Sequence, residues 1–260
     1  MRPGWTGAPA RCARFLPLAA GLLAGALLAG NAIAADETID RCRHSDAALH
    51  ANGELPSFRL ALAAGKPRVG VLGTGSAGHV GEVKQSWPET FKHSIAPKLR
   101  GAPLETLVTS RRGETAEQQL KVLPGLLAGK PALLVWQTGT VDAVRHVDVD
   151  DFAAVLIDGI DQARRAGADV VLMGPQFSPQ ASTLVNFTRY IGIMEQVARA
   201  YDVPFLDRYQ LMQDWAEDGR VDLSGGRETW AAAAKFVHDC VGSALAELVG
   251  EAAGLNAKAP

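Results

Sequence analysis

Short apolar runs alternate with longer segments of helical periodicity along most of the chain. The strand candidates are Arg68 to Leu72, Leu104 to Thr109, Ala132 to Trp136, Asp169 to Met173 and Val203 to Leu206. Helical spacing marks residues 55–64, 87–99, 115–127, 151–166, 184–201, 209–217 and 227–249. Because this alternation is typical of βαβ units, it predicts a three-layer α/β/α domain with a five-stranded parallel sheet.

The loops that follow the strands are the place to look for chemistry. In an open parallel sheet, ligands bind outside the carboxyl ends of the strands. Four loops qualify, at residues 73–81, 110–114, 137–146 and 174–179. We therefore expect the functional site to be built from these four loops.

The beginning of the chain has the pattern of an export signal. Three arginines precede an apolar run over residues 15–29, which Pro17 interrupts, and Ala32-Ile33-Ala34 offers small residues for cleavage. This order predicts a secretory signal peptide over residues 1–34 and a periplasmic or secreted protein with no membrane attachment after cleavage. A retained membrane anchor is the alternative, which the short and interrupted run disfavours.

The rest of the chain divides into an N-terminal extension with one helix (35–66), the α/β domain (67–251) and a C-terminal tail (252–260). Removal of the signal leaves Cys42 and Cys240. In an oxidising compartment, this pair predicts a disulfide between the extension and the last helix. Two free thiols are the alternative.

Composition narrows the classes of function. Hydrophobic residues make up 47% and charged residues 21%, as in an ordinary globular domain. The net charge of −2 gives no support for nucleic-acid binding. The sequence has no H-x-x-x-H or C-x-x-C spacing, so we predict no metal centre.

A glycine-rich stretch after the first strand offers a dinucleotide-binding alternative. Residues 73–78 match G-x-G-x-x-G, and Arg111 and Arg112 follow the second strand. The fingerprint requires a helix that opens at the loop and an acidic residue or an arginine about 20 positions later. Pro88 places the start of the helix well after the glycine-rich loop, and the second strand ends farther along the chain than the fingerprint allows. This alternative is therefore weak.

The four loops together resemble, in order, the conserved segments of the SGNH/GDSL hydrolase family. The glycine and hydroxyl residues after the first strand resemble the nucleophile turn, and residues 110–115 resemble the second segment. Residues 136–142 resemble the third segment, and the strand and loop at 168–176 also fit. The resemblance covers about Val69 to Leu248. It implies a flavodoxin-like α/β/α fold and cofactor-independent ester hydrolysis.

The resemblance also implies roles for individual residues. Gly75 occupies the family's nucleophile position, and Ser76, one residue later, is the candidate nucleophile. Gly113 is the candidate oxyanion donor, and Gln137, at the end of a central strand, offers an amide to the cleft. His238, on the last helix, is the candidate base, with a hydrogen-bonded core histidine as the alternative.

The expected catalytic pattern is incomplete. Val141 replaces the family's asparagine, although Asp142, whose usual role is local loop bonding, is retained. Gly225, three residues after Asp222, stands where the family has its histidine. His79 and His146 lie in or beside the predicted site loops and are weaker candidates for the base.

Two functions therefore compete. The first is an exported SGNH/GDSL-like hydrolase that acts on acyl or acetyl esters through a serine nucleophile. The alternative is a catalytically inactive protein of the same fold that binds an acylated or carbohydrate ligand. In both, the expected partner is a small-molecule or glycan ester.

Overall fold

The computed structural model describes residues 41–78, 86–226 and 228–256. The predicted signal peptide and His79 lie outside these residues. Within the described ranges, no helix is long and apolar enough to cross a membrane.

The described residues form one six-stranded sheet with the order β1-β6-β5-β4-β2-β3. The strands are β1 (Leu49–His50), β2 (Arg68–Gly73), β3 (Glu105–Ser110), β4 (Leu133–Gln137), β5 (Asp169–Met173) and β6 (Phe205–Leu206). Strands β2 to β6 are parallel, which confirms the predicted five parallel strands and their flavodoxin-like order. The short strand β1 was not predicted and pairs antiparallel with β6 at the edge.

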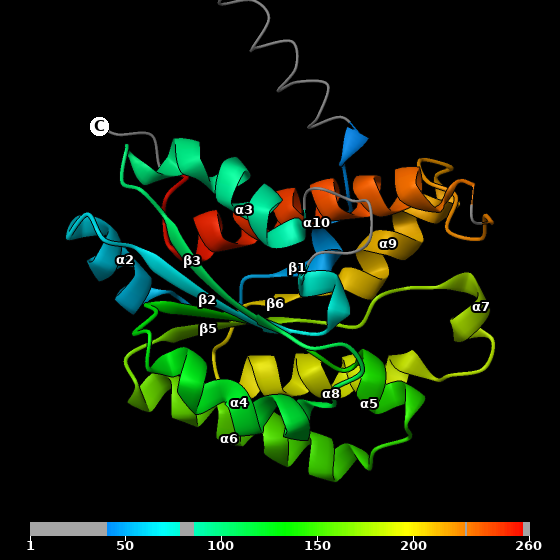
Figure 1. The fold of residues 1–260 in the computed structure, drawn as a ribbon, viewed down its shortest axis with the longest axis horizontal. Coiled ribbons are helices and arrows are strands. Elements are labelled where there is room, and N and C mark those ends of the chain that lie inside the picture. The colour runs from blue at the N-terminus through cyan, green and yellow to red at the C-terminus, as the bar shows by residue number, and fades with distance from the viewer. Residues whose placement is uncertain (1–40, 79–85, 227, 257–260) are drawn as a thin grey trace, which may run out of the picture. The chain divides into compact units, whose positions relative to one another are not determined.

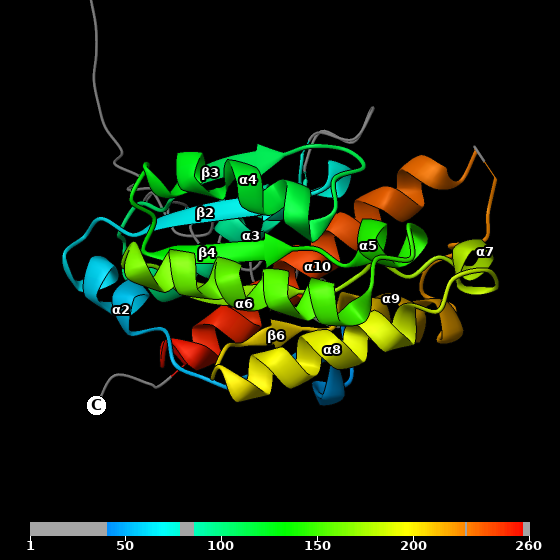
Figure 2. The same cartoon turned by 90° about the horizontal axis from the view of Figure 1, so that it is seen from below.

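Helices cover both faces of the sheet (Figure 1). The helices of the described residues are α2 (Pro56–Ala63), α3 (Trp87–Ile95), α4 (Ala116–Leu127), α5 (Thr140–Val144), α6 (Val149–Arg165), α7 (Pro179–Ser182), α8 (Phe187–Ala200), α9 (Arg208–Glu217) and α10 (Trp230–Ala252). Helices α3, α9 and α10 lie on one face, and α4, α6 and α8 lie on the other (Figures 1 and 2). The three-layer architecture is therefore as predicted.

Side chains of the strands alternate between the two faces of the sheet, and each face has a hydrophobic core beneath its helices. Val69 and Val71 of β2 face the layer of α3 and α10, whereas Leu72 faces α4. On β5, Val171 faces the layer of α3 and α10, and Val170 faces the layer of α4. Successive side chains of a strand point to opposite faces, so a strand with helices on both sides is apolar throughout.

The ends of several helices differ from the predicted ones because side-chain caps set them. Asp148 accepts hydrogen bonds from the N–H groups of Asp150 and Asp151, so α6 begins at Val149. Asn186 caps α8, which therefore begins at Phe187 rather than at residue 184. Caps satisfy backbone N–H groups that have no partner within the helix.

The predicted disulfide is confirmed: Cys42 is bonded to Cys240 of α10, with their Cα atoms 5.0 Å apart. Ala48, Leu55 and Phe58 of the preceding extension are fully buried in the core beneath α10. The described part of the extension therefore packs into the core of the domain and is covalently bonded to it.

Candidate active site

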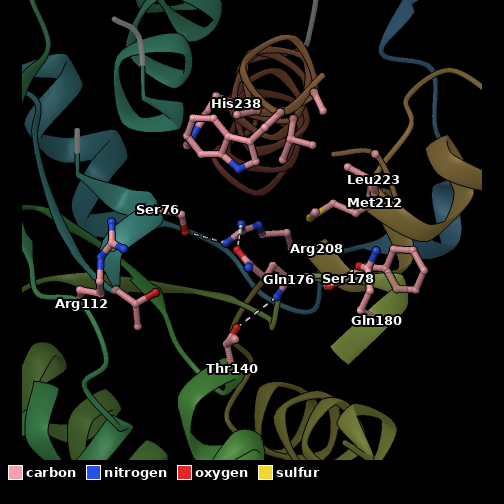
Figure 3. Close-up of a pocket in the computed structure, with 18 of the residues that line it drawn as sticks. Ser76, Arg112, Thr140, Gln176, Ser178, Gln180, Arg208, Met212, Leu223 and His238 are labelled. Atoms are coloured by element: carbon pink, nitrogen blue, oxygen red, sulfur yellow. Dashed lines mark hydrogen bonds between the residues drawn. The ribbon is translucent and has the colours of Figure 1, made fainter. Parts of the chain in front are cut away.

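A cavity of about 720 Å³ opens at the carboxyl ends of the parallel strands (Figure 3). All four predicted loops contribute to it, through residues 74–76, 112–113, 140–141 and 176–178. The remaining wall comes from helices α9 and α10 and from Gln180, Asp222, Leu223 and Gly225. The cavity thus lies where the order of the parallel strands reverses, between β2 and β4.

A tight turn after β2 brings Ser76 to the cavity. A Cβ atom on Gly73 would lie 2.7 Å from the Cβ of Ala77, so this close return of the chain requires glycine. The Ser110 hydroxyl donates to the Thr74 carbonyl at 2.6 Å and ties the turn to β3. Residues Gly75–Ala77 form one 3₁₀ turn, and both Gly75 and Ser76 line the cavity.

The Ser76 hydroxyl lies between two strong donors. Its Oγ accepts a hydrogen bond from Nε2 of Gln137 at 2.8 Å and from Nη1 of Arg208 at 3.1 Å. Figure 3 shows the Arg208 side chain reaching across the cavity to Ser76. A hydroxyl has two acceptor lone pairs and one proton to donate. Both lone pairs of Ser76 are thus engaged, and its proton is what it can offer to a ligand.

Gln137 is held in place by Trp87. The indole Nε1–H of Trp87 donates to Oε1 of Gln137 at 3.0 Å, so the amide nitrogen points the other way, to Thr74 Oγ1 and Ser76 Oγ. Both Trp87 and Gln137 are buried. The amide therefore acts on the site as a donor, through its contact with Ser76.

His238 lines the cavity but has the wrong tautomer for a base acting on Ser76. Its Nδ1 accepts a hydrogen bond at 3.1 Å from the backbone N–H of Trp87, the first residue of α3. Burial and, to a lesser degree, the charge of Arg208 lower the pKa of His238 to about 4, so the ring is neutral. In a neutral ring whose Nδ1 accepts, Nε2 carries the proton. His238 thus presents an N–H donor.

The other predicted site residues have different positions. Gly113 lines the cavity in the left-handed region (φ 79°), and Val141 also lines it. Asp142 lies behind the loop, where its carboxylate accepts from the N–H groups of Ala116 at 2.9 Å and Gly139 at 3.2 Å. Burial raises the pKa of Asp142, and these hydrogen bonds oppose the increase. Asp142 therefore organises the loop.

Gly225 cannot be exchanged for a histidine without a change of loop conformation. A Cβ atom there would lie 2.1 Å from Oγ1 of Thr229 and 2.9 Å from Oδ2 of Asp222. Asp222 is fully exposed, and hydrogen bonds from Ser224 lower its pKa. In the loop that supplies the Asp–His pair in the family pattern, Asp222 is therefore bonded to its neighbour Ser224, and Gly225 has no room for a side chain.

The sequence reasoning missed Arg208. It is the first residue of α9, directly after β6, and is only 2% exposed. Its Nη2 donates to Oε1 of Gln176 at 2.9 Å, and burial lowers its pKa to about 10, which leaves it charged near neutral pH. The sequence offered one indication of its role: Arg208 lies just beyond the end of a predicted strand, where site residues are expected.

Comparison with known proteins agrees with this architecture. A sequence model of the non-GDSL lipase-like family matches residues 41–255. The chain belongs to this family. Its resemblance to SGNH/GDSL hydrolases is thereby confirmed, together with the departure from the GDSL motif.

Individual relatives are more distant. The chain is 29% identical to esterase TesA of Pseudomonas aeruginosa over 127 residues, which are 48% of this chain and 62% of that esterase. The match therefore spans less than two thirds of the relative's length.

Solved structures resemble the fold of this family member. A crystal structure of TesA is 23% identical, with a TM-score of 0.56 over 70% of this chain and 99% of that one. An acetylxylan esterase from Geobacillus stearothermophilus, solved as a catalytic mutant, is 14% identical, with a TM-score of 0.57 over 71% of this chain and 94% of that one. These likenesses establish the shared fold.

Proposed function

We propose that the protein is an exported, SGNH-fold binding protein whose cavity holds an acyl ligand without hydrolysing it. The observation that carries this proposal is the environment of Ser76, whose Oγ accepts from both Gln137 and Arg208. A serine becomes a nucleophile when a base removes its proton and leaves a lone pair to attack. Both hydrogen-bond partners of Ser76 in the described part of the chain donate to it. The Nε2–H of His238 is a donor as well, because Nδ1 accepts from Trp87.

The same groups suit the binding of a carbonyl oxygen. Ser76, Arg208 and His238 all line the cavity and all carry N–H or O–H groups. A ligand oxygen with two lone pairs complements such a donor set. Figure 3 shows Met212 and Leu223 on the side of Arg208 away from Ser76, and Trp230 also lines the cavity. These three side chains form an apolar wall that fits the chain of an acyl group.

Ester hydrolysis through Ser76 is the second candidate. Membership of a lipase-like family favours it, as does the placement of Ser76 after the first central strand. The guanidinium of Arg208, 3.1 Å from Oγ, would also stabilise a serine alkoxide. In this case an acyl-enzyme would form on Ser76, and water would release it.

Export is supported by two independent features. The first 34 residues carry the pattern of a cleaved signal peptide. The disulfide between Cys42 and Cys240 requires an oxidising compartment to persist. We propose a periplasmic or secreted location on these grounds.

Turnover of p-nitrophenyl butyrate and binding of methyl octanoate test the two functions together. We expect the wild type and Ser76→Ala to release p-nitrophenol equally slowly, and methyl octanoate to bind in calorimetry. Trp230→Ala, which removes part of the apolar wall, should weaken that binding. Turnover that depends on Ser76 would establish the hydrolase instead.

A further inference from the structure

A buried positive charge without a carboxylate partner lies at the centre of the cavity. Among the described residues, Arg208 forms no ion pair, and it donates hydrogen bonds to the neutral oxygens of Ser76 and Gln176. Its Nε–H has no hydrogen-bond partner there. A guanidinium has five N–H donors, so most of its donor capacity is unused.

The acidic groups near Arg208 interact with other partners. Asp207 caps α9 by accepting from the N–H of Gln210 at 3.0 Å. Asp239 pairs with Arg41 at 2.9 Å and with Lys235 at 2.6 Å. Asp222 lines the cavity but is fully exposed and accepts from Ser224.

The other ionisable groups of the cavity do not compensate this charge. His238 is neutral, and it lines the cavity beside Arg208. Arg112 contributes a second guanidinium from the loop after β3, where Figure 3 shows it on the other side of Ser76. The cavity is thus cationic at its polar end.

A buried charge is costly unless an opposite charge pairs with it. A ligand anion would supply that charge and accept hydrogen bonds from N–H groups of Arg208 that have no other partner. Of the two guanidiniums only that of Arg208 is buried, whereas Arg112 is exposed to solvent. One buried positive charge is balanced by one negative charge, which suits a carboxylate better than a dianion. The apolar wall of Met212, Leu223 and Trp230 suits an apolar substituent on the rest of the ligand.

We propose that the cavity binds an organic monocarboxylate, whose carboxylate pairs with Arg208 and whose apolar chain packs against α9 and α10. This inference rests on the proposed ligand-binding function and adds the charge of the ligand to it. Arg208 is the residue that selects the acid over its ester.

Calorimetric titration of the full mature protein with octanoate and with methyl octanoate tests the inference near neutral pH. We expect octanoate to bind at least about tenfold more tightly, because charge-assisted hydrogen bonds exceed neutral ones by this order. In Arg208→Met the preference for octanoate should disappear, and in Arg208→Lys it should be retained in part. Arg165→Met, which changes an exposed arginine of α6, is the control and should keep the preference.

The outcomes separate the two proposals. If methyl octanoate binds as tightly as octanoate to the wild type, the carboxylate site is refuted and the acyl-binding cavity stands. If neither binds, both proposals fail. A preference that persists in Arg208→Met would also overturn the inference, and the comparison in the wild type decides the matter even if that variant fails to fold.

Discussion

The buried neutral state of His238 makes the stability of the protein depend on pH in a defined window. His238→Asn replaces the ring with a side chain that does not titrate, while its amide oxygen can still accept from the Trp87 N–H. The pKa of His238 is lowered from 6.5 to about 4, mainly by burial. Between about pH 6.5 and pH 4 the unfolded chain therefore binds a proton that the folded chain does not.

The sign and size of the effect follow from proton linkage. Stability rises with pH wherever the unfolded state binds more protons, so His238 costs stability progressively as the pH falls from 6.5 to about 4. One pKa unit corresponds to about 1.36 kcal/mol, so the full shift amounts to about 3 kcal/mol. Above this window His238 is neutral in both states and contributes no pH dependence.

Urea unfolding of the wild type and of His238→Asn at a series of pH values measures this contribution. Other titrating groups are common to both proteins, so the difference between their unfolding free energies isolates His238. We expect the wild type to lose about 3 kcal/mol relative to the variant between about pH 7 and pH 4. A difference that does not change with pH would refute the assigned protonation state.

His238→Phe is the companion variant. It also removes the titration, but it leaves the buried Trp87 N–H without its acceptor. Relative to His238→Asn, which also lacks the titration, we expect a loss of about 1–3 kcal/mol that is the same at every pH.

Two further predictions concern the scaffold. Replacement of both Cys42 and Cys240 with serine should lower the free energy of unfolding by about 2–5 kcal/mol in denaturant titrations, because the bridge closes a long loop of the unfolded chain. Gly242→Ala should destabilise by about 1–3 kcal/mol, because its Cβ would lie 2.6 Å from the Cβ of Thr90 where α10 crosses α3. Gly192→Ala, in α8 with open space around it, is the matched control and should be neutral or slightly stabilising.

The sequence was informative about the sheet for a physical reason. A parallel strand covered by helices on both faces is apolar throughout, so β4 and β5 were visible as continuous apolar runs. The edge strand β1 has two residues, and α5 has five, so neither carries a measurable periodicity. The four loops that line the cavity could be predicted from the positions of the strand ends alone.

The site itself was only partly predictable. Ser76, Gly75, Gly113 and His238 line the cavity, because each follows a strand or faces inward from α10, and their predicted roles stay predictions. The protonation of His238 was not predictable, since its partner, the Trp87 N–H, is 151 positions away.

The uncompensated charge of Arg208 could not be read from the sequence either. An arginine at the start of a helix is ordinarily solvated. Its 2% exposure is a property of the folded cavity, in which α9 follows β6 immediately.

The most direct test of the central claim is the mass of the intact, folded protein after exposure to a fluorophosphonate probe, which reacts with activated serines. The environment of Ser76 predicts an unmodified protein, under conditions in which an active serine esterase is labelled completely. A single adduct mapped to Ser76, and absent in Ser76→Ala, would contradict the account and establish a catalytic serine.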